Sequence, residues 1–118
     1  MRILVVDDEA FLREFLAEEL ARLGHEMVAA STAPEALAEL EHLPPDLILL
    51  DLRMPGMDGV DALRKLRDRK ARAPIIVLTA RRNPETIAHA KSLGACEVLF
   101  KPVDLSQLFE IVKRKLGG

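Results

Sequence analysis

The sequence has few aromatic residues, a single cysteine and no long apolar run. Among its 118 residues there is no tryptophan or tyrosine, and phenylalanine occurs 4 times. Cys96 is the one cysteine, which excludes an internal disulfide and fits a reducing compartment. No apolar run approaches the roughly 18 to 20 residues of a membrane-spanning helix. The first residues, MRILVVDD, turn acidic too early for a secretory signal peptide.

The chain has the composition of a globular domain. Apolar residues make up 49% and charged residues 31%, and the formal net charge is -2. Such a charge gives no overall attraction to nucleic acids or anionic membranes. A chain of this length is large enough to bury its own core. We therefore expect one cytoplasmic domain over residues 1–118, with no output domain, no membrane partner and no direct nucleic-acid partner.

Short apolar runs alternate with segments of helical periodicity along the chain. The predicted strands are residues 3–6, 27–30, 47–50, 75–78 and 97–100. The predicted helices are residues 10–23, from a cap at 31 or 32 to 40, from a cap at 58 through 66, 84–93, and from a cap at 104 to 116. The first helix carries one apolar stripe that is expected to face the core: Phe11, Phe15, Leu16, Leu20 and Leu23.

The predicted strands are apolar on both faces. Such strands need cover on both sides, which favours a parallel sheet between two layers of helices. Because crossover connections are right-handed, the carboxyl ends of all the strands meet at one edge of the sheet. Ligands bind at that edge in open α/β sheets.

Polar residues end four of these strands. Asp7 and Asp8 follow the first strand, Asp51 the third, Thr79 the fourth and Lys101 the fifth. A single aspartate at a strand end is more often a helix cap or a turn former. The convergence of all these groups on one edge instead favours a ligand site.

Three carboxylates at one edge would repel one another unless a cation lay among them. Hard oxygen donors beside a group that accepts phosphate suit Mg²⁺, and Mn²⁺ can replace it. With that metal, the ammonium of Lys101 and the hydroxyl of Thr79 would stabilise the oxygens of a phosphoryl group during its transfer. One carboxylate is then the nucleophile that forms an acyl phosphate.

Four motifs, ILVVDDE, LILLDLRMPGMDG, IIVLTA and FKP, occur in a specific order and spacing. Together they resemble a bacterial two-component response-regulator receiver domain of the chemotaxis-Y type, over essentially the whole chain. The resemblance implies a flavodoxin-like α/β fold, a three-layer (βα)5 sandwich with a parallel sheet of strand order 2-1-3-4-5. It also implies a phosphoprotein that is not an enzyme beyond its own phosphorylation and dephosphorylation.

The same resemblance gives roles to individual residues. Asp51 would accept the phosphoryl group from a histidine of a sensor kinase or of a histidine phosphotransfer protein. Lys101 would contact that group, and a cis peptide would join Lys101 to Pro102. The implied ligands of Mg²⁺ are Asp8, Asp51, the backbone carbonyl of Arg53 and, through water, Asp7.

Phosphorylation adds a charge of about -1.5 to -2 and three strong hydrogen-bond acceptors. Thr79 is expected to swing toward them and to shift the face formed by the fourth helix, the last strand and the last helix between two arrangements. The implied partner of this face is an output domain or a downstream protein. The implied state is a monomer or a phosphorylation-dependent dimer.

One departure from the family pattern concerns this switch. The aromatic residue that is usual three positions before the lysine is Val98 here, and the nearest aromatic residue is Phe100. By strand alternation Phe100 is expected to face the same way as Val98. We therefore expect either that Thr79 carries the change without an aromatic partner, or that the output face is less tightly coupled.

A second departure concerns the lifetime of the acyl phosphate. Arg53 lies two residues after Asp51, and Arg81 lies two residues after Thr79. Bulky cations at these places would shield the acyl phosphate or displace the attacking water. We expect slower self-dephosphorylation than with small or acidic residues.

Other functions on a similar fold fit the sequence less well. An aspartate-nucleophile phosphatase of the haloacid-dehalogenase type needs a second acid where this chain has Arg53. In a flavodoxin-type carrier of flavin mononucleotide, the first loop must bind the phosphate of the cofactor, which the acids at 7–9 would repel. A phosphorylation-independent interaction module would not need the intact polar set. The basic run at 64–72 is better explained as cations at a helix C-terminus than as a nucleic-acid patch.

Overall fold

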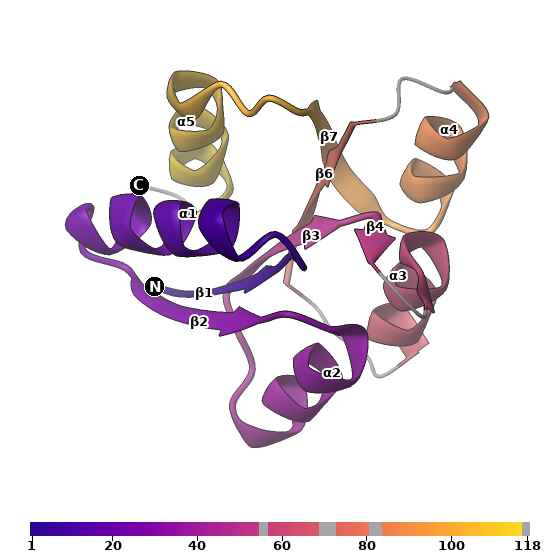
Figure 1. The fold of residues 1–118 in the computed structure, drawn as a ribbon, viewed down its shortest axis with the longest axis horizontal. Coiled ribbons are helices and arrows are strands. Elements are labelled where there is room, and N and C mark those ends of the chain that lie inside the picture. Colours follow the sequence, from indigo (N-terminus) through magenta and orange to yellow (C-terminus); the bar gives the residue numbers. More distant parts are fainter. Residues whose placement is uncertain (55–56, 69–72, 81–83, 117–118) are drawn as a thin grey trace.

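The main sheet of the protein has five parallel strands in the order β2-β1-β3-β6-β7 (Figure 1). The structure is a computed structural model that describes residues 1–54, 57–68, 73–80 and 84–116, apart from the side chains of 53–54, 57–60 and 62. The strands of this sheet are β1 (Arg2–Val6), β2 (Glu26–Ala30), β3 (Leu47–Asp51), β6 (Ile75–Thr79) and β7 (Ala95–Phe100). Counted along the chain, this is the predicted order 2-1-3-4-5, and the α/β fold class is confirmed.

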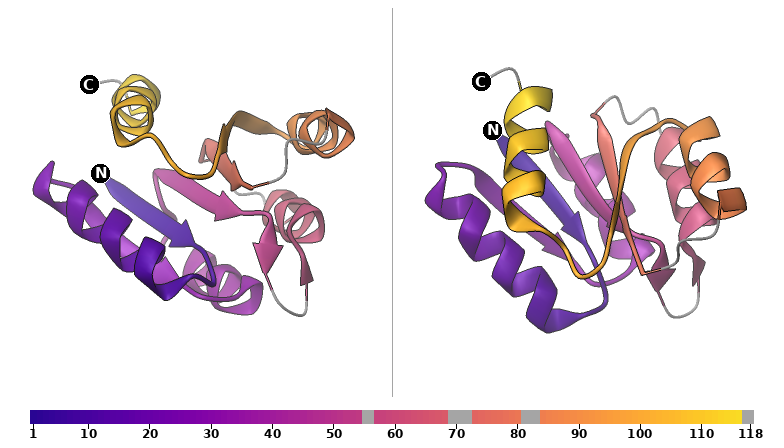
Figure 2. Two further views of the ribbon diagram at one scale, coloured as in Figure 1. Left: turned by 45° about the horizontal axis from the view of Figure 1, so that its top comes forward. Right: turned by 90° about the horizontal axis from the view of Figure 1, so that it is seen from above.

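Helices cover both faces of the sheet (Figure 2). The helices are α1 (Ala10–Arg22), α2 (Ala33–His42), α3 (Gly59–Asp68), α4 (Pro84–Ser92) and α5 (Leu105–Lys115). One apolar cluster joins the sheet to α1 and α5, and a second joins it to α2, α3 and α4. The predicted arrangement of a parallel sheet between two helix layers is therefore confirmed.

The central strand β3 shows why the sheet needs this double cover. Leu47 and Leu49 pack into the cluster on the α1 and α5 side, whereas Ile48 and Leu50 pack into the opposite cluster. All four side chains are 0% exposed. Their alternation follows from the two-residue period of a strand. The continuous apolar run therefore fixes β3 in the middle of the molecule.

Polar caps fix two of the helix starts where the sequence predicts them. Thr32 Oγ1 accepts a hydrogen bond from the Glu35 backbone N–H at 3.3 Å at the start of α2. Asp104 Oδ1 accepts one from the Gln107 N–H at 3.2 Å at the start of α5. Each cap satisfies an N–H group that the first helical turn leaves without a helical partner.

The prediction that the whole stripe of α1 faces the core is wrong for its aromatic residues. Leu16 and Leu20 are 0% exposed, but Phe11 is 86% exposed and Phe15 is 38% exposed. Leu23, at the end of the helix, is 55% exposed. The helix face that carries residues 12, 16 and 20 packs on the sheet. Residues 11 and 15 lie about 100° around the helix axis from this face, at 3.6 residues per turn, and their side chains point away from the sheet.

Two short strands after β3 were not predicted. β4 (Arg53–Met54) pairs antiparallel with β5 (Met57–Asp58), just before α3. The sequence predicts only a turn here, because two-residue strands leave no periodicity to detect. The strand β7 also begins earlier than predicted, and its register with β6 shifts between Ile75 and Ile76.

Among the described residues, no helix is long and apolar enough to cross a bilayer.

Candidate functional site

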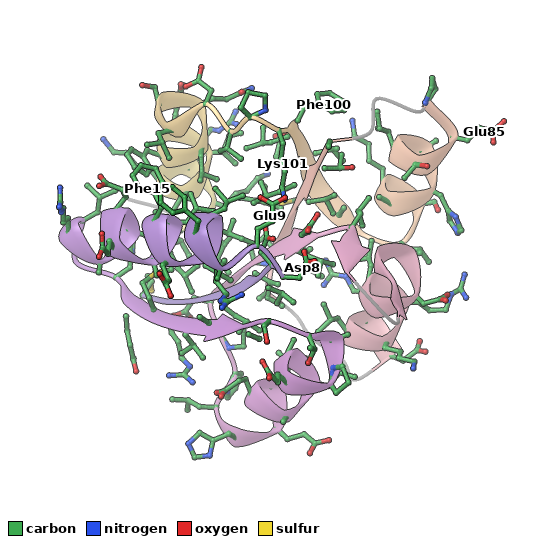
Figure 3. All side chains as sticks on the ribbon, viewed as in Figure 1. Asp8, Glu9, Phe15, Glu85, Phe100 and Lys101 are labelled. Atoms are coloured by element: carbon green, nitrogen blue, oxygen red, sulfur yellow. The ribbon has the colours of Figure 1, made fainter. Side chains whose placement is uncertain are left out.

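The carboxyl ends of four strands bring the predicted polar residues to one edge of the sheet. Asp51 and Thr79 are the last residues of β3 and β6, and Asp7 and Lys101 directly follow β1 and β7. In Figure 3, Asp8, Glu9 and Lys101 lie together near the ends of these strands. The parallel sheet thus gathers groups that are far apart in the sequence.

Three acids form a cluster at this edge. Carboxylate oxygens of Asp7, Asp8 and Asp51 lie within 4.8 Å of one another. Asp7 is 0% exposed and Asp51 is 2% exposed, whereas Asp8 is exposed. The donor set is made of hard oxygen atoms only, with one member open to solvent, which suits Mg²⁺ with retained water. The residues present therefore fit a divalent cation.

Lys101 provides the positive charge of the site. Its Nζ lies 3.1 Å from Asp7 Oδ2, 3.3 Å from Glu9 Oε1 and 3.4 Å from Asp51 Oδ2. Burial alone would lower the pKa of Lys101. The hydrogen bond to Asp7 and the charges of the neighbouring carboxylates outweigh burial and raise this pKa above its ordinary value. Lys101 therefore stays an ammonium at neutral pH.

Asp7 is held at all of its polar atoms. Its backbone N–H donates to Ala30 O at 3.1 Å, and its carbonyl oxygen accepts from Arg13 Nη1 at 2.7 Å. Its side-chain oxygens accept from the Glu9 N–H at 2.9 Å and from Lys101 Nζ. A buried carboxylate with this many donors has little freedom to move. Asp7 is therefore a fixed part of the site.

Backbone hydrogen bonds set the positions of Asp51, Thr79 and Lys101. The Lys101 N–H donates to the Thr79 carbonyl oxygen at 2.8 Å, and the Leu52 N–H donates to Leu78 O at 3.3 Å. Thr79 itself is 0% exposed. The peptide bond between Lys101 and Pro102 is cis, the geometry that the resemblance implies.

Of the residues predicted to tune the site, the structure describes the side chain of Val98. Arg81 lies outside the described residues. Arg53 belongs to β4, but its side chain lies outside the description as well. Val98 is half-buried and packs against the apolar cluster on the α2, α3 and α4 side, while its neighbour Leu99 belongs to the opposite cluster.

An apolar groove adjoins the polar site. It has a volume of about 340 Å³, and its lining includes Glu9, Phe11, Phe15, Lys101, Pro102 and Val103. The exposed aromatic residues of α1 form one wall, and the segment between β7 and α5 forms the other. Exposed apolar surface beside a charged site is a common mark of protein docking.

Sequence reasoning missed Glu9 and Arg13. In the sequence, Glu9 stands out only as one of the acids at 7–9, and Arg13 lies outside the apolar stripe of the first helix. The sequence offers one indication for Glu9. It directly precedes the first predicted helix, but glutamate is not among the residues preferred at a helix N-cap. The contact of Arg13 with Asp7 depends on how α1 packs back against β1, which no local pattern encodes.

Comparison with known sequences agrees with this geometry. The sequence model described as the response regulator receiver domain matches residues 3–113. The chain belongs to this family. Receiver domains of two-component systems interact with histidine kinases or phosphotransfer proteins and with output domains, typically bind Mg²⁺, and are generally not classical enzymes.

Individual relatives cover nearly the whole receiver domain. The chain is 41% identical over 115 residues to the regulatory protein AtoC of Escherichia coli, matching 98% of this chain and 25% of AtoC. It is 39% identical to the response regulator PhoP of Pseudomonas aeruginosa, matching 92% of this chain and 48% of PhoP. The chain thus spans a quarter to about half of the length of these relatives.

A solved structure confirms the same relationship for the fold. The CheY-like response regulator receiver domain protein of Methanospirillum hungatei superposes with a TM-score of 0.93 at 32% identity. The match covers 98% of this chain and 93% of that chain. The receiver fold is therefore shared along essentially its full length.

Proposed function

We propose that this receiver domain accepts a phosphoryl group on Asp51 from a phosphohistidine of a sensor kinase or a histidine phosphotransfer protein. The observation that carries the proposal is the placement of Asp51. Asp51 is the last residue of β3 and is 2% exposed. Its Oδ2 lies 3.4 Å from Lys101 Nζ, and its carboxylate belongs to the acid cluster with Asp7 and Asp8. A carboxylate in such a setting is a suitable nucleophile for phosphoryl transfer.

In the proposed transfer, an Asp51 oxygen attacks the phosphorus atom of the phosphohistidine. A P–O bond forms as the P–N bond breaks, and the electron pair of that bond leaves with the imidazole, which takes up a proton. The Lys101 ammonium and the Thr79 hydroxyl stabilise the charge on the transferring oxygens. A bound Mg²⁺ supplies further positive charge. The residues that would hold it are Asp8, Asp51, the Arg53 carbonyl and, through water, Asp7.

The donor protein is proposed to dock on the groove beside Lys101. Phe11 is 86% exposed at the edge of the acid site, and the groove reaches from this residue to Pro102 and Val103. An apolar contact here would hold a donor helix next to Asp51. Because protein contacts supply proximity, they would accelerate transfer beyond what a small donor achieves.

Thr79 is proposed to pass the signal to the face formed by α4, β7 and α5. Its hydroxyl would turn toward the new phosphoryl oxygens and draw the following loop with it. Val98 lacks the aromatic ring that usually accompanies this movement in the family. A structure with a phosphoryl mimic, compared between wild type and Val98→Tyr, tests the coupling. Movement of the face only in the variant supports weak coupling, and full movement in the wild type excludes it.

Arg53 and Arg81 are proposed to slow the loss of the phosphoryl group. Their side chains follow Asp51 and Thr79 by two residues and would obstruct the attacking water. Replacing both with alanine is expected to accelerate the decay of the phosphorylated protein. An unchanged decay rate would refute this role.

The central experiment is incubation with a small phosphodonor and Mg²⁺, followed by intact-mass measurement. We expect a gain of one phosphoryl group in the wild type and in Asp68→Asn, which alters an exposed acid on α3. The gain should be absent from Asp51→Asn and after removal of Mg²⁺ with a chelator. No gain in the wild type with any donor would favour a phosphorylation-independent interaction module instead.

A further inference from the structure

Glu9 occupies an unusual place at the start of α1. It is the N-cap residue, yet its side chain makes no capping hydrogen bond. Its Oε1 instead lies 3.3 Å from Lys101 Nζ. Its backbone N–H donates to Asp7 Oδ1 at 2.9 Å, which anchors the residue beside the acid cluster. The Glu9 side chain therefore contacts Lys101 instead of accepting a hydrogen bond from the first turn of the helix, as the side chain of an N-cap residue commonly does.

The three carboxylates around Lys101 differ in how far they can move. Asp7 is fully buried, and its carbonyl oxygen and both carboxylate oxygens accept hydrogen bonds from Arg13, the Glu9 N–H and Lys101. Asp51 is 2% exposed at the end of a central strand. The Glu9 side chain is 60% exposed. Because it has solvent on its open side, Glu9 is the partner that Lys101 can leave at the lowest cost.

We propose that Glu9 is a positioning residue that restrains the Lys101 ammonium in the unphosphorylated protein. The inference rests on the proposed phosphorylation of Asp51. An ammonium has three N–H donors, and three carboxylates surround this one. Lys101 must redirect a donor to reach a phosphoryl oxygen. The contact with Glu9 is the one given up, so its strength adds to the barrier for phosphorylation.

The restraint can be measured with three variants. Glu9→Gln removes the charge at nearly constant shape, and Glu9→Asp keeps the charge but shortens the side chain by one methylene. Glu18→Gln makes the same change in net charge at an exposed position of α1 and serves as the control. Phosphorylation rates are measured at saturating Mg²⁺ with acetyl phosphate, a dianion near neutral pH, and with phosphoramidate, which carries less negative charge.

Glu9→Gln is expected to raise the rate about two- to fivefold with both donors, the range given by a partly exposed ion pair. Glu9→Asp should also be faster than wild type, because the shortened carboxylate no longer reaches Lys101, and Glu18→Gln should match wild type. Unchanged rates in Glu9→Gln would overturn the proposal. A gain limited to acetyl phosphate and lost at high salt would overturn it too, since that pattern reports only the repulsion of an anionic donor.

A second measurement does not depend on phosphorylation. In the unphosphorylated protein, the side-chain NH₃⁺ of Lys101 should give a protected signal in ¹⁵N-lysine NMR spectra, and Glu9→Gln should accelerate its exchange with water. Unchanged exchange would overturn the restraint even if Asp51 is phosphorylated. Faster exchange in a protein that no donor phosphorylates would instead leave the restraint standing and refute the function.

Discussion

The guanidinium of Arg13 lies against the backbone of Asp7, and its Nη1 donates to the Asp7 carbonyl oxygen at 2.7 Å. This contact joins the first turn of α1 to the end of β1 across the loop that carries Asp8 and Glu9. Because Asp7 is 0% exposed, its carbonyl has poor access to water if the guanidinium is removed.

We expect Arg13→Met to lower the free energy of unfolding by about 1.5 to 3 kcal/mol, the range for a hydrogen bond to a charged donor. Urea denaturation measures this change. Arg22→Met is the matched control, because the Arg22 side chain is 73% exposed and pairs with Glu19 in the same helix. The control should stay within about 0.5 kcal/mol of wild type. Equal stability of the two variants would show that Arg13 contributes nothing beyond a surface contact.

Gly24 and Gly94 allow a second matched comparison. Both have positive φ, 95° and 99°, after α1 and α4, so alanine at either site should cost about 1 to 2 kcal/mol. A Cβ at Gly24 meets nothing within 4 Å, whereas a Cβ at Gly94 would lie 2.8 Å from Arg67 Nε. Arg67 also donates to Gly94 O at 2.7 Å and to Ala73 O at 3.2 Å. Gly94→Ala should therefore destabilise the protein more than Gly24→Ala.

The excess should vanish in an Arg67→Ala background, where the added methyl group has no side chain to displace. The cycle compares Gly24→Ala and Gly94→Ala, each made with Arg67 present and in the Arg67→Ala background, by thermal or urea unfolding. An excess that persists without the Arg67 side chain would place its cause in the backbone of this turn.

Glu35 gives a pH-dependent prediction. Hydrogen bonds from the backbone N–H and the hydroxyl of Ser31, at 2.8 Å and 3.0 Å, hold the pKa of Glu35 below its ordinary value of 4.5. A carboxylate with a lowered pKa stabilises the fold above its unfolded-state pKa. That contribution is lost as the pH falls through the folded-state pKa.

The stability difference between wild type and Glu35→Gln should accordingly be constant near neutral pH and shrink as the pH is lowered below about 4.5. Urea denaturation across this range measures it, and NMR titration of Ser31→Ala should show the pKa of Glu35 returning toward its ordinary value. A stability difference that does not change with pH would contradict the assignment.

Divalent metal should stabilise the folded protein through the acid cluster. Mg²⁺ at a hundredfold excess over its dissociation constant is expected to add about 2.7 kcal/mol to the free energy of unfolding. Asp8→Asn should abolish most of this gain, because the exposed member of the cluster is lost. Asp68→Asn, with the same change of charge on α3, should retain it. An equal response of both variants would mean that the metal binds elsewhere or only as a diffuse counterion.

The sequence by itself determined the order of the main-sheet strands and the helices, the parallel sheet and the edge where the polar residues meet. The reason is that these features depend on local patterns. Runs such as 47–50 need cover on both faces, and strand ends in a parallel sheet point one way. Because Asp7, Asp51, Thr79 and Lys101 end or follow parallel strands, this rule places all four at the same edge of the sheet.

Only the tertiary structure decided which of these groups touch and which surfaces stay open. The periodicity of α1 shows an apolar stripe, but the rotation of the helix on the sheet buries Leu16 and exposes Phe11. The contacts of Glu9 with Lys101 and of Arg13 with Asp7 likewise depend on how α1 packs. Glu9 and Lys101 are 92 residues apart in the sequence, so no local pattern indicates their contact. It forms only because the sheet brings the ends of distant strands together.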